Sequence, residues 1–380
     1  MAVKQVRNAI FAGLSGAVVI MAFANNLHDV TQRWWPNPFQ ASLSPAPNSN
    51  LNAIAQAADT PPNPNLLDRL QALTSTPTFY VAANGDDQQE GTANAPFQTL
   101  SQAITAVTTA QAKSPETQFI IQLAAGTYGD TNTSEPLLIP PGVTLKGQGA
   151  ATTVKQSLQL SHNSRVEQLV LDETGILIRP QENATGEVSV QQVSITRGFL
   201  TIKAAGPLPT PKITVKQLTM ADSCILVSGL ARPEIRDVQL RGNVGVDDFS
   251  LAHCSENGLL ASDDRMPLIQ LLGAADLENI VVSNTNLALF NQAEGSVIKN
   301  LRIVNSLNGV ENTGNLSLDG PNLENVSYTG ICNQGTLTLQ RPGFDPTTAT
   351  TTAQCLVPGL DQPPPSPINL AGNLDNVKVN

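Results

Sequence analysis

A six-residue pattern, apolar-x-x-apolar-x-apolar, recurs along the second half of the chain and limits the possible folds more than any other feature. Most successive copies begin 20–25 residues apart, and two wider intervals of 42 and 51 residues each leave room for one degenerate copy. A period of this length is typical of a solenoid. The copies are Val166–Leu171, Val190–Ile195, Val215–Met220, Ile235–Leu240, Leu277–Val282, Ile298–Ile303, Leu323–Tyr328 and Leu374–Val379.

Several copies are followed by a short segment in which apolar residues alternate with others, as a half-buried strand requires. These pairs are Ile176/Ile178, Leu200/Ile202, Ile225/Val227 and Leu287/Leu289. Helical periodicity and the longer leucine-rich consensus are both missing. The pattern therefore predicts an all-β fold, a right-handed parallel β-helix of about ten coils. In this arrangement Leu169, Val193, Leu218, Leu301 and Val326 should share one axial row.

The third position of the pattern is rich in amides, and the second is mostly charged. Stacked about 4.8 Å apart, the amides can form a hydrogen-bonded ladder, whereas the charged column is expected to be a solvated stripe. The third-position residues are Gln168, Gln192, Gln217, Asp237, Asn279, Asn300, Asn325 and Asn376.

A further polar column follows seven residues after the start of each copy. Its first three members, Glu173, Arg197 and Asp222, would be neighbours on successive coils. They could form a surface ion ladder or part of a ligand-binding site. The column continues with Gly242, Asn284, Asn305 and Gly330.

The first 24 residues have the order of a secretory signal: a basic start, then the apolar run Ile10–Ala24 that ends in small residues. An uncleaved anchor is the alternative, and residues 8–24 could then tether the chain to a membrane. Residues 25–77 are rich in Pro and Asn and predict a linker. Residues 78–154 should form a cap and the first coils, and residues 155–380 the repeats. The expected location is secreted, periplasmic or at the cell surface.

The amino-acid composition limits the classes of binding partner that are expected. The net charge of −10 and a charged fraction of 14% argue against nucleic acid, whose phosphates require a basic surface. The four cysteines all lie in the exported part, where disulfides are permitted, and their spacings fit no zinc motif. Cys224 and Cys332 should lie several coils apart, and Cys332–Cys355 is the better candidate bridge. No cofactor is expected, although calcium remains possible.

The region before the repeats predicts a strand, a turn and then a helix, because Thr99 with Gln102 forms a plausible capping box. The segments Gly126–Tyr128 and Ile139–Gly149 add short strands and turns. The opening contains Tyr80, Val81, Gly85, Asp87 (one place late), Gly91, Thr92, Pro96 and Phe97.

These residues resemble the N-terminal part of secreted pectin-lyase-like proteins and, more closely, a bacterial domain of unknown function that opens with Tyr-Val-x-x-x-Gly-x-Asp. The resemblance covers about residues 78–154. It implies a right-handed parallel β-helix whose open N-terminal end is covered by a helix near residues 99–112. It also implies a superfamily rich in polysaccharide lyases, hydrolases and esterases, but it transfers no active site.

Candidate catalytic residues are few and gather where the repeat is interrupted. Glycoside hydrolysis uses paired carboxylates, but adjacent residues on a strand point to opposite faces. Each acidic pair in this stretch therefore offers at most one carboxylate to a groove. The stretch could instead be a plain surface loop or a calcium site. The candidates are Asp247, Asp248, His253, Asp264 and Arg265.

Three functions remain open on the sequence alone. The first is an exported protein that binds or organises envelope or extracellular polysaccharide without catalysis. The second is a polysaccharide lyase or glycoside hydrolase with an unrecognised acidic site. The third is a structural module that assembles through its C-terminal end; the sequence does not specify an oligomeric state.

Overall fold

The structure of this chain is a computed structural model that describes residues 76–129, 135–181, 184–204, 210–243, 267–344, 350–352, 369–372 and 377–379. The chain divides into two units, Met1–Leu73 and Thr74–Asn380, and every described residue lies in the second. The signal or anchor and nearly all of the linker therefore fall outside the described residues and stay predictions. None of the described helices has the length and apolar character needed to cross a membrane.

Parallel strands make up almost all of the described structure, which confirms the predicted β-helix. The two helical segments are α5 (Leu100–Lys113) and the 3-10 turn η1 (Gly149–Ala151). All pairings between the named strands are parallel. The strands are β1 (Thr78–Val81), β2 (Phe119–Leu123), β3 (Gly126–Tyr128), β4 (Leu137–Ile139), β5 (Val143–Lys146), β6 (Thr152–Val154), β7 (Leu158–Leu160), β8 (Arg165–Asp172), β9 (Ile176–Ile178), β10 (Glu187–Thr196), β11 (Phe199–Ala204), β12 (Lys212–Ala221), β13 (Cys224–Gly229), β14 (Glu234–Arg241), β15 (Pro267–Leu271), β16 (Asp276–Ser283), β17 (Leu287–Asn291), β18 (Glu294–Asn312), β19 (Asn315–Asp319), β20 (Asn322–Asn333), β21 (Thr336–Gln340), β22 (Thr350–Thr352), β23 (Asn369–Gly372) and β24 (Val377–Val379).

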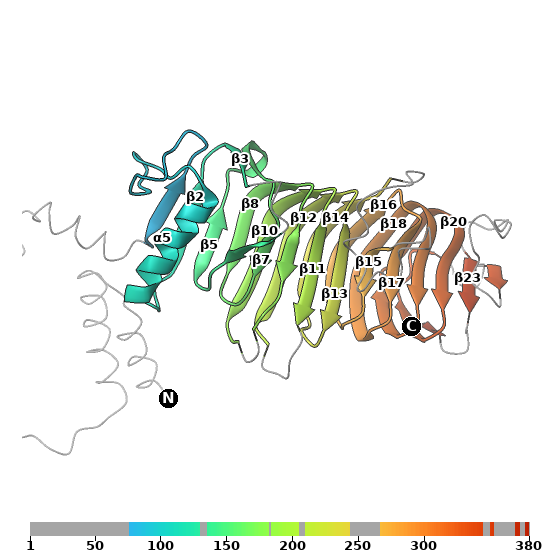
Figure 1. The fold of residues 1–380 in the computed structure, drawn as a ribbon. Coiled ribbons are helices and arrows are strands. Elements are labelled where there is room, and N and C mark those ends of the chain that lie inside the picture. Colours follow the sequence, from blue (N-terminus) through green and yellow to red (C-terminus); the bar gives the residue numbers. More distant parts are fainter. Residues whose placement is uncertain are drawn as a thin grey trace, which may run out of the picture. The chain divides into compact units, whose positions relative to one another are not determined.

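The strands stack into three faces over about nine turns, close to the ten expected (Figure 1). Face 1 consists of β1, β2 and β5, then the first halves of the long strands β8, β10, β12, β14, β16 and β18, and finally β19, β21 and β24. Face 2 consists of β3 and β6, the second halves of β8, β10, β12, β14 and β16, the middle of β18 and the start of β20. Face 3 takes β4, β7, β9, β11, β13, β15, β17, the ends of β18 and β20, and β23.

Each coil buries its apolar residues against the same positions of the next coil. Leu169, Val193 and Leu218 are direct partners on face 2, and the row continues through Val238, Ile280 and Leu301. All six side chains are at most 2% exposed. Burial of one such side chain contributes roughly 1.5–3 kcal/mol. The predicted common row is therefore present as far as Leu301.

The prediction was wrong for Val326, because the pattern slips by part of a copy after Leu301. Ile298 pairs with Leu318 and Ile303 with Leu323, so the true copy on this coil is Leu318–Leu323, in which Pro321 takes the fourth position. Val326 instead pairs with Ser306. A similar shift affects the last copy, where Val377 lies beside Leu337 on face 1. A proline in place of a buried aliphatic residue hid the true register.

The corners of the coil are made by residues in the left-handed conformation. The first corner, between faces 1 and 2, holds Gln168, Gln192, Gln217, Asp237, Asn279 and Asn300, with φ between 54° and 57°. The second corner, between faces 2 and 3, holds Glu173, Arg197, Asp222, Asn284, Asn305 and Asn325, with φ between 49° and 58°. Asparagine and aspartate tolerate this conformation best, apart from glycine.

The first corner forms the amide ladder expected from the third position of the pattern. Gln168 Nε2 donates to Gln192 Oε1 at 3.1 Å, Asn279 Nδ2 donates to Asp237 Oδ1 at 2.9 Å, and Asn300 Nδ2 donates to Asn279 Oδ1 at 2.9 Å. The register slip moves Asn325 out of this ladder and into the second corner. Asn376 lies outside the described residues.

Charged residues on face 1 pair across coils as the second-position stripe predicts. Lys146 Nζ lies 3.2 Å from Glu167 Oε1, and Arg236 Nη1 lies 3.1 Å from Glu278 Oε2. The four side chains are between 18% and 46% exposed. Each pair therefore adds little to stability, about 0–1 kcal/mol.

Helix α5 covers the N-terminal end of the stack, beside β1 and β2 (Figure 1). Leu100, Ala103 and Val107 are its buried residues. Thr99 is the N-cap, and its Oγ1 accepts a hydrogen bond from the N–H of Gln102 at 3.2 Å. The expected helix and its cap are therefore confirmed. The cover protects apolar rows and strand edges that would otherwise be exposed to solvent.

The residues of the opening motif build this cap. Asp87 accepts hydrogen bonds from the N–H groups of Gln98 and Thr99, both at 2.9 Å, and from Thr99 Oγ1 at 2.8 Å. A Cβ atom at Gly85 would lie 2.3 Å from the carbonyl oxygen of Phe97, and Gly91 has a φ of 71° against the Phe97 ring. The motif is thus explained by folding of the cap.

A second amide ladder lies inside the solenoid, where face 3 turns toward face 1. Asn291, Asn312 and Asn333 are at most 1% exposed. Asn291 Nδ2 donates to Asn312 Oδ1 at 2.8 Å, and Asn312 Nδ2 donates to Asn333 Oδ1 at 2.7 Å. The same Asn312 nitrogen also reaches the carbonyl oxygen of Thr336 at 3.0 Å. These contacts fasten three consecutive coils together.

Replacement of Asn312 by alanine should destabilise the protein by about 2–4 kcal/mol, because it leaves buried partners on both neighbouring coils unsatisfied. Chemical denaturation followed by circular dichroism measures the change. Asn315→Ala is the control, since Asn315 is exposed and its side chain forms no hydrogen bond within the described structure. Equal stability of the two variants would contradict the role of the ladder.

Replacement of Asp87 by asparagine should cost about 1 kcal/mol at neutral pH, as loss of a helix cap does. Partial burial alone would raise the pKa of Asp87, but hydrogen bonds from Thr99 and Gln98 outweigh it and lower the pKa in the folded protein. The stabilising contribution is therefore present above the unfolded pKa of about 3.9 and is lost as the pH falls through the lower folded pKa.

Thermal melts of both proteins between pH 7 and pH 2.5 test this dependence. The difference between wild type and Asp87→Asn should shrink at the acidic end. Glu90→Gln, at an exposed position nearby, should show no such difference at either pH. A wild-type advantage that grows as the pH falls would refute the assignment.

Candidate functional site

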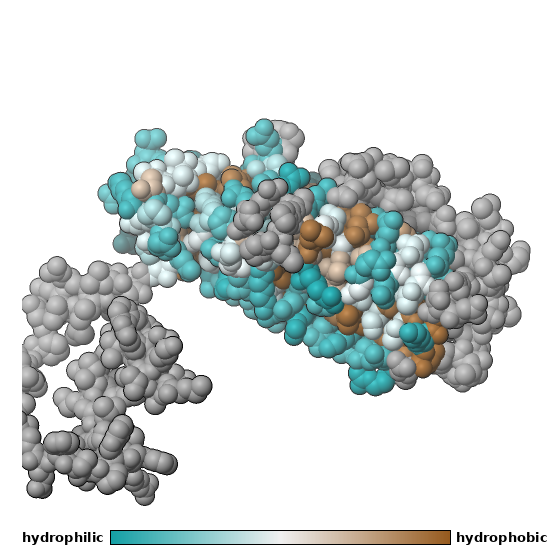
Figure 2. Space-filling model, turned by 90° about the horizontal axis from the view of Figure 1, so that it is seen from below, coloured by the Kyte–Doolittle hydropathy of each residue, from teal (hydrophilic) through white to brown (hydrophobic). Residues whose placement is uncertain are grey.

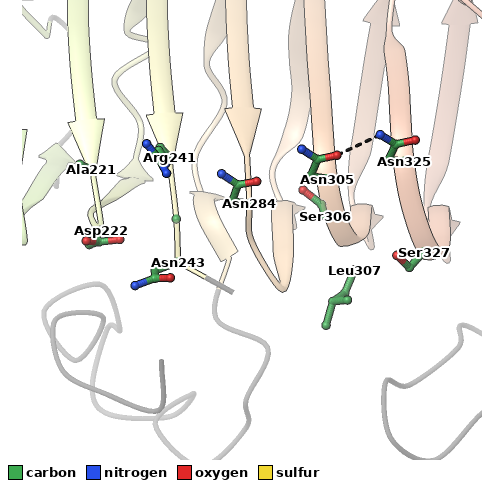
Figure 3. A pocket seen from close by; sticks show the side chains of 11 residues that line it. Ala221, Asp222, Arg241, Asn243, Asn284, Asn305, Ser306, Leu307, Asn325 and Ser327 are labelled. Carbon is green, nitrogen blue, oxygen red and sulfur yellow. Dashed lines mark hydrogen bonds between the residues drawn. The ribbon is translucent and has the colours of Figure 1, made fainter. Parts of the chain in front are cut away.

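A groove with a cavity volume of about 770 Å³ lies along the second corner. This volume is within the range of small-molecule sites. The groove crosses several coils, from the end of β12 to β20 (Figure 3). Its lining consists of Ala221, Asp222, Arg241, Gly242, Asn243, Asn284, Asn305, Ser306, Leu307, Asn325 and Ser327.

The groove residues are placed by the repeat itself. The backbone N–H of Asp222 donates to the carbonyl of Arg241, that of Gly242 to Ser283, and that of Asn284 to Val304. These bonds set Asp222, Gly242, Asn284 and Asn305 on successive coils. Because each coil turns at this position, polar side chains project at intervals of about 4.8 Å along the axis. Figure 3 shows Asn284, Asn305 and Asn325 in one row.

The amides of this row are incompletely paired, unlike those of the first corner. Asn325 Nδ2 donates to Asn305 Oδ1 at 3.0 Å. Within the described structure, the ladder stops there: the side chain of Asn284 forms no hydrogen bond, and Asn305 donates none. Two corners of the same geometry therefore differ, since one uses its amides for stability and the other leaves donors and acceptors available.

The charged groups of the groove are Asp222 and Arg241, which lie on adjacent coils. Asp222 is the only carboxylate in the lining, and Leu307 offers an apolar surface beside the amides. Such a mixture can bind hydroxyl groups through hydrogen bonds and a ring face through apolar contact. The described lining lacks the carboxylate pair that glycoside hydrolysis uses.

The sequence-derived column Glu173, Arg197 and Asp222 separates into two parts. Arg197 Nη2 lies 2.8 Å from Glu173 Oε1 and 3.0 Å from Asp172 Oδ1, so the first two residues form the expected surface ion pair. Asp222 lines the groove. Predictions about Asp247, Asp248, His253, Asp264 and Arg265 fall outside the described residues and stay untested.

Arg241 and Asn243, which lie on either side of the column position Gly242, were not predicted as site residues, and Asn325 was predicted in the wrong corner. The true copy Leu318–Leu323 aligns Asn325 with Asn305. The buried ladder was not predicted either, although Asn291, Asn312 and Asn333 recur at 21-residue intervals. Each is followed two residues later by alanine or glycine, which is a recognisable signal.

The described coils contain two cysteines. Cys224 and Cys332 are both disulfide-bonded. They lie on β13 and β20, which several coils separate, so they do not bond to each other. The bridge from Cys332 to Cys355 stays a prediction, because Cys355 lies outside the described residues. In the described ranges, no group of three or more His, Cys, Asp or Glu residues could hold a metal ion.

The surface seen in Figure 2 is hydrophilic over much of its described area, with hydrophobic residues in small separate groups. The large apolar side chains that are exposed in the described structure are Leu138, Leu230 and Val379, which lie on β4, just after β13 and on β24.

Comparison with solved structures finds matches at low similarity. One is a GH136 lacto-N-biosidase from Eubacterium ramulus, with 11% identity over 83% of this chain and 70% of that chain, at a TM-score of 0.38. Another is a rhamnogalacturonan lyase, with 10% identity over 80% of this chain and 87% of that chain, at a TM-score of 0.36. At these values the likeness supports no conclusion about activity.

No curated protein matches the sequence significantly. Residues 83–315 match a family described as a protein of unknown function, DUF1565. Of the opening motif, Tyr80 and Val81 precede the matched range, whereas Gly85 to Phe97 fall inside it. Because the match spans more than half of the 380 residues, this protein belongs to the DUF1565 family.

Proposed function

We propose that this protein is exported and binds polysaccharide along the second-corner groove without cleaving it. The observation that supports this most directly is the open amide row, in which Asn284 and Asn305 retain hydrogen-bonding capacity on successive coils. Sugar hydroxyls both donate and accept, as asparagine amides do. A chain laid along the axis would meet one such group per coil.

The apolar side chain of Leu307 and the hydroxyl of Ser327 complete the complementarity, since a sugar ring offers C–H groups on one face and hydroxyls at its edge. The groove residues come from several successive coils, which suits a polymer rather than an enclosed small molecule (Figure 3). Binding of this kind distributes its free energy over many modest contacts, each about 0.5–1.5 kcal/mol.

Catalysis is the alternative that this proposal opposes. Asp222 has no second carboxylate beside it in the described lining, so the acid and base pair of a glycoside hydrolase is not assembled there. The proposal therefore assigns the groove to recognition, and predicts intact polysaccharide after prolonged contact with the protein.

The double substitution Asn284→Gly and Asn305→Gly should lower affinity for a polysaccharide by about tenfold or more, because it removes two amides from the groove. Glycine tolerates the left-handed conformation that both positions adopt, so the fold should persist. Affinity electrophoresis of the full chain in gels that contain neutral or acidic polysaccharides measures the loss.

Asn315→Ala provides the control, since it removes an exposed amide outside the groove. Reducing ends and unsaturated products are assayed in the same incubations, with and without calcium. Unchanged retardation of the double variant would remove the groove from the proposal. Release of new ends by the wild type would replace binding with catalysis.

Export predicts that the cysteines leave the cell oxidised. Reductant should lower the melting temperature by several degrees, because loss of a native disulfide costs about 2–4 kcal/mol. A variant with serine at Cys224 and Cys332 should melt at the lower temperature with or without reductant. Alkylation of protein taken directly from its source should find blocked thiols, and fully reactive thiols would argue against export.

A further inference from the structure

Arg241 is the arginine that lines the groove. Five other arginines on the described coils have a carboxylate oxygen within 3.1 Å of a guanidinium nitrogen: Arg197, Arg232, Arg236, Arg302 and Arg341. The guanidinium of Arg241 has no ion pair or hydrogen bond in the described part of the chain. Arg165 and Arg179 are likewise unpaired there, but they lie outside the groove, so Arg241 is the unpaired cation of the described lining.

The neighbours of Arg241 explain why it stays unpaired. Its direct partners on the adjacent coils are Ala221 and Ser283. Both are small and neither carries a charge, so the guanidinium remains accessible from both sides. Elsewhere the same row holds Asp172, whose carboxylate binds Arg197. In this row, Asp172 forms an ion pair with Arg197, whereas the residues on either side of Arg241 are small and uncharged.

Arg241 and Asn305 give the groove hydrogen-bond donors that no acceptor of the described structure occupies. Arginine has five N–H donors and no acceptor. The acceptor oxygen of Asn305 is occupied by Asn325, which leaves its NH₂ group as the available part. A ligand group that satisfies several donors at once is an anion, and a planar carboxylate matches the guanidinium with two parallel hydrogen bonds.

Asp222 limits how many anions the groove accepts. Its carboxylate lines the groove one coil away from Arg241. A chain with a negative charge on every sugar would place some of those charges against Asp222, on a protein whose net charge is already −10. A single anion at Arg241, with uncharged units over the amides, avoids that repulsion.

We infer that Arg241 determines specificity by binding one anionic substituent, a carboxylate or an acidic ester, on an otherwise uncharged polysaccharide. This inference rests on the proposed function, because it assigns the ligand class of the same groove. The uncharged units lie against Asn284, Asn305 and Leu307, and the substituent lies between Ala221 and Ser283.

The test titrates the full chain by calorimetry with a matched set of glucans: neutral, sparsely carboxylated, sparsely sulfated, and carboxylated on every unit. Wild type should bind the sparsely substituted glucans about tenfold more tightly than the neutral one, and the two substituents distinguish carboxylate from ester recognition. Arg241→Gln should abolish this preference, so that the affinities for the substituted and neutral glucans become about equal. Arg241→Lys should retain part of the preference, since it keeps the charge but loses the planar fork.

Arg165→Gln is the matched control, because Arg165 is also exposed and unpaired in the described structure but lies on face 1. It should leave every affinity unchanged. An Arg241→Gln protein that keeps the preference, or an equal loss in Arg165→Gln, overturns the inference while neutral binding upholds the proposed function. Tightest binding of the fully carboxylated glucan overturns the role of Asp222. Failure of every glucan to bind overturns both.

Discussion

Hydrogen bonding between each strand and the equivalent strand of the next coil is the constraint on which this structure depends. It requires every coil to turn at the same positions, so that residues in one column share a backbone conformation. Two of those positions adopt positive φ in coil after coil. The left-handed conformation is unfavourable for most side chains, by roughly 1–2 kcal/mol per residue. The columns are therefore filled largely by asparagine, aspartate and glycine, or by longer side chains that hydrogen-bond to the next coil.

The same columns provide stability in one corner and, in the proposed function, recognition in the other. In the first corner, Asn279 and Asn300 use their amides to bind neighbouring coils. In the second corner, Asn284 and Asn305 have the same conformation but leave hydrogen-bonding groups unused. A solenoid can thus acquire a binding surface by interrupting a ladder, with little change in the backbone. The spacing of the strands then sets the spacing of the ligand contacts.

Much of the fold was predictable because the same apolar pattern recurs many times, so the strands can be identified even where a single copy could be assigned to more than one structure. The hexads located faces 1 and 2, the alternating pairs located face 3, and Thr99 located the cap. The register failed at one coil, where Pro321 replaces a buried aliphatic residue and the apolar pattern no longer marks the position. The groove was predictable only in part: Asp222, Asn284 and Asn305 lay in one visible column. Arg241 gave no signal, because what distinguishes it is the small size of Ala221 and Ser283 on the adjacent coils.

The buried ladder of Asn291, Asn312 and Asn333 has a consequence for how such a protein can change its length. The side-chain oxygen Oδ1 of Asn291 has no hydrogen-bond partner in the described structure, and the preceding coil has Leu271 at that position. The ladder therefore begins abruptly, with a free acceptor at its first member. Its members are interchangeable, so a block of 21 residues could be deleted or duplicated and every amide would still meet an identical amide. The number of coils in this part of the molecule can therefore change in whole steps without interrupting the ladder, and each such step also adds or removes groove residues such as Asn305 and Leu307.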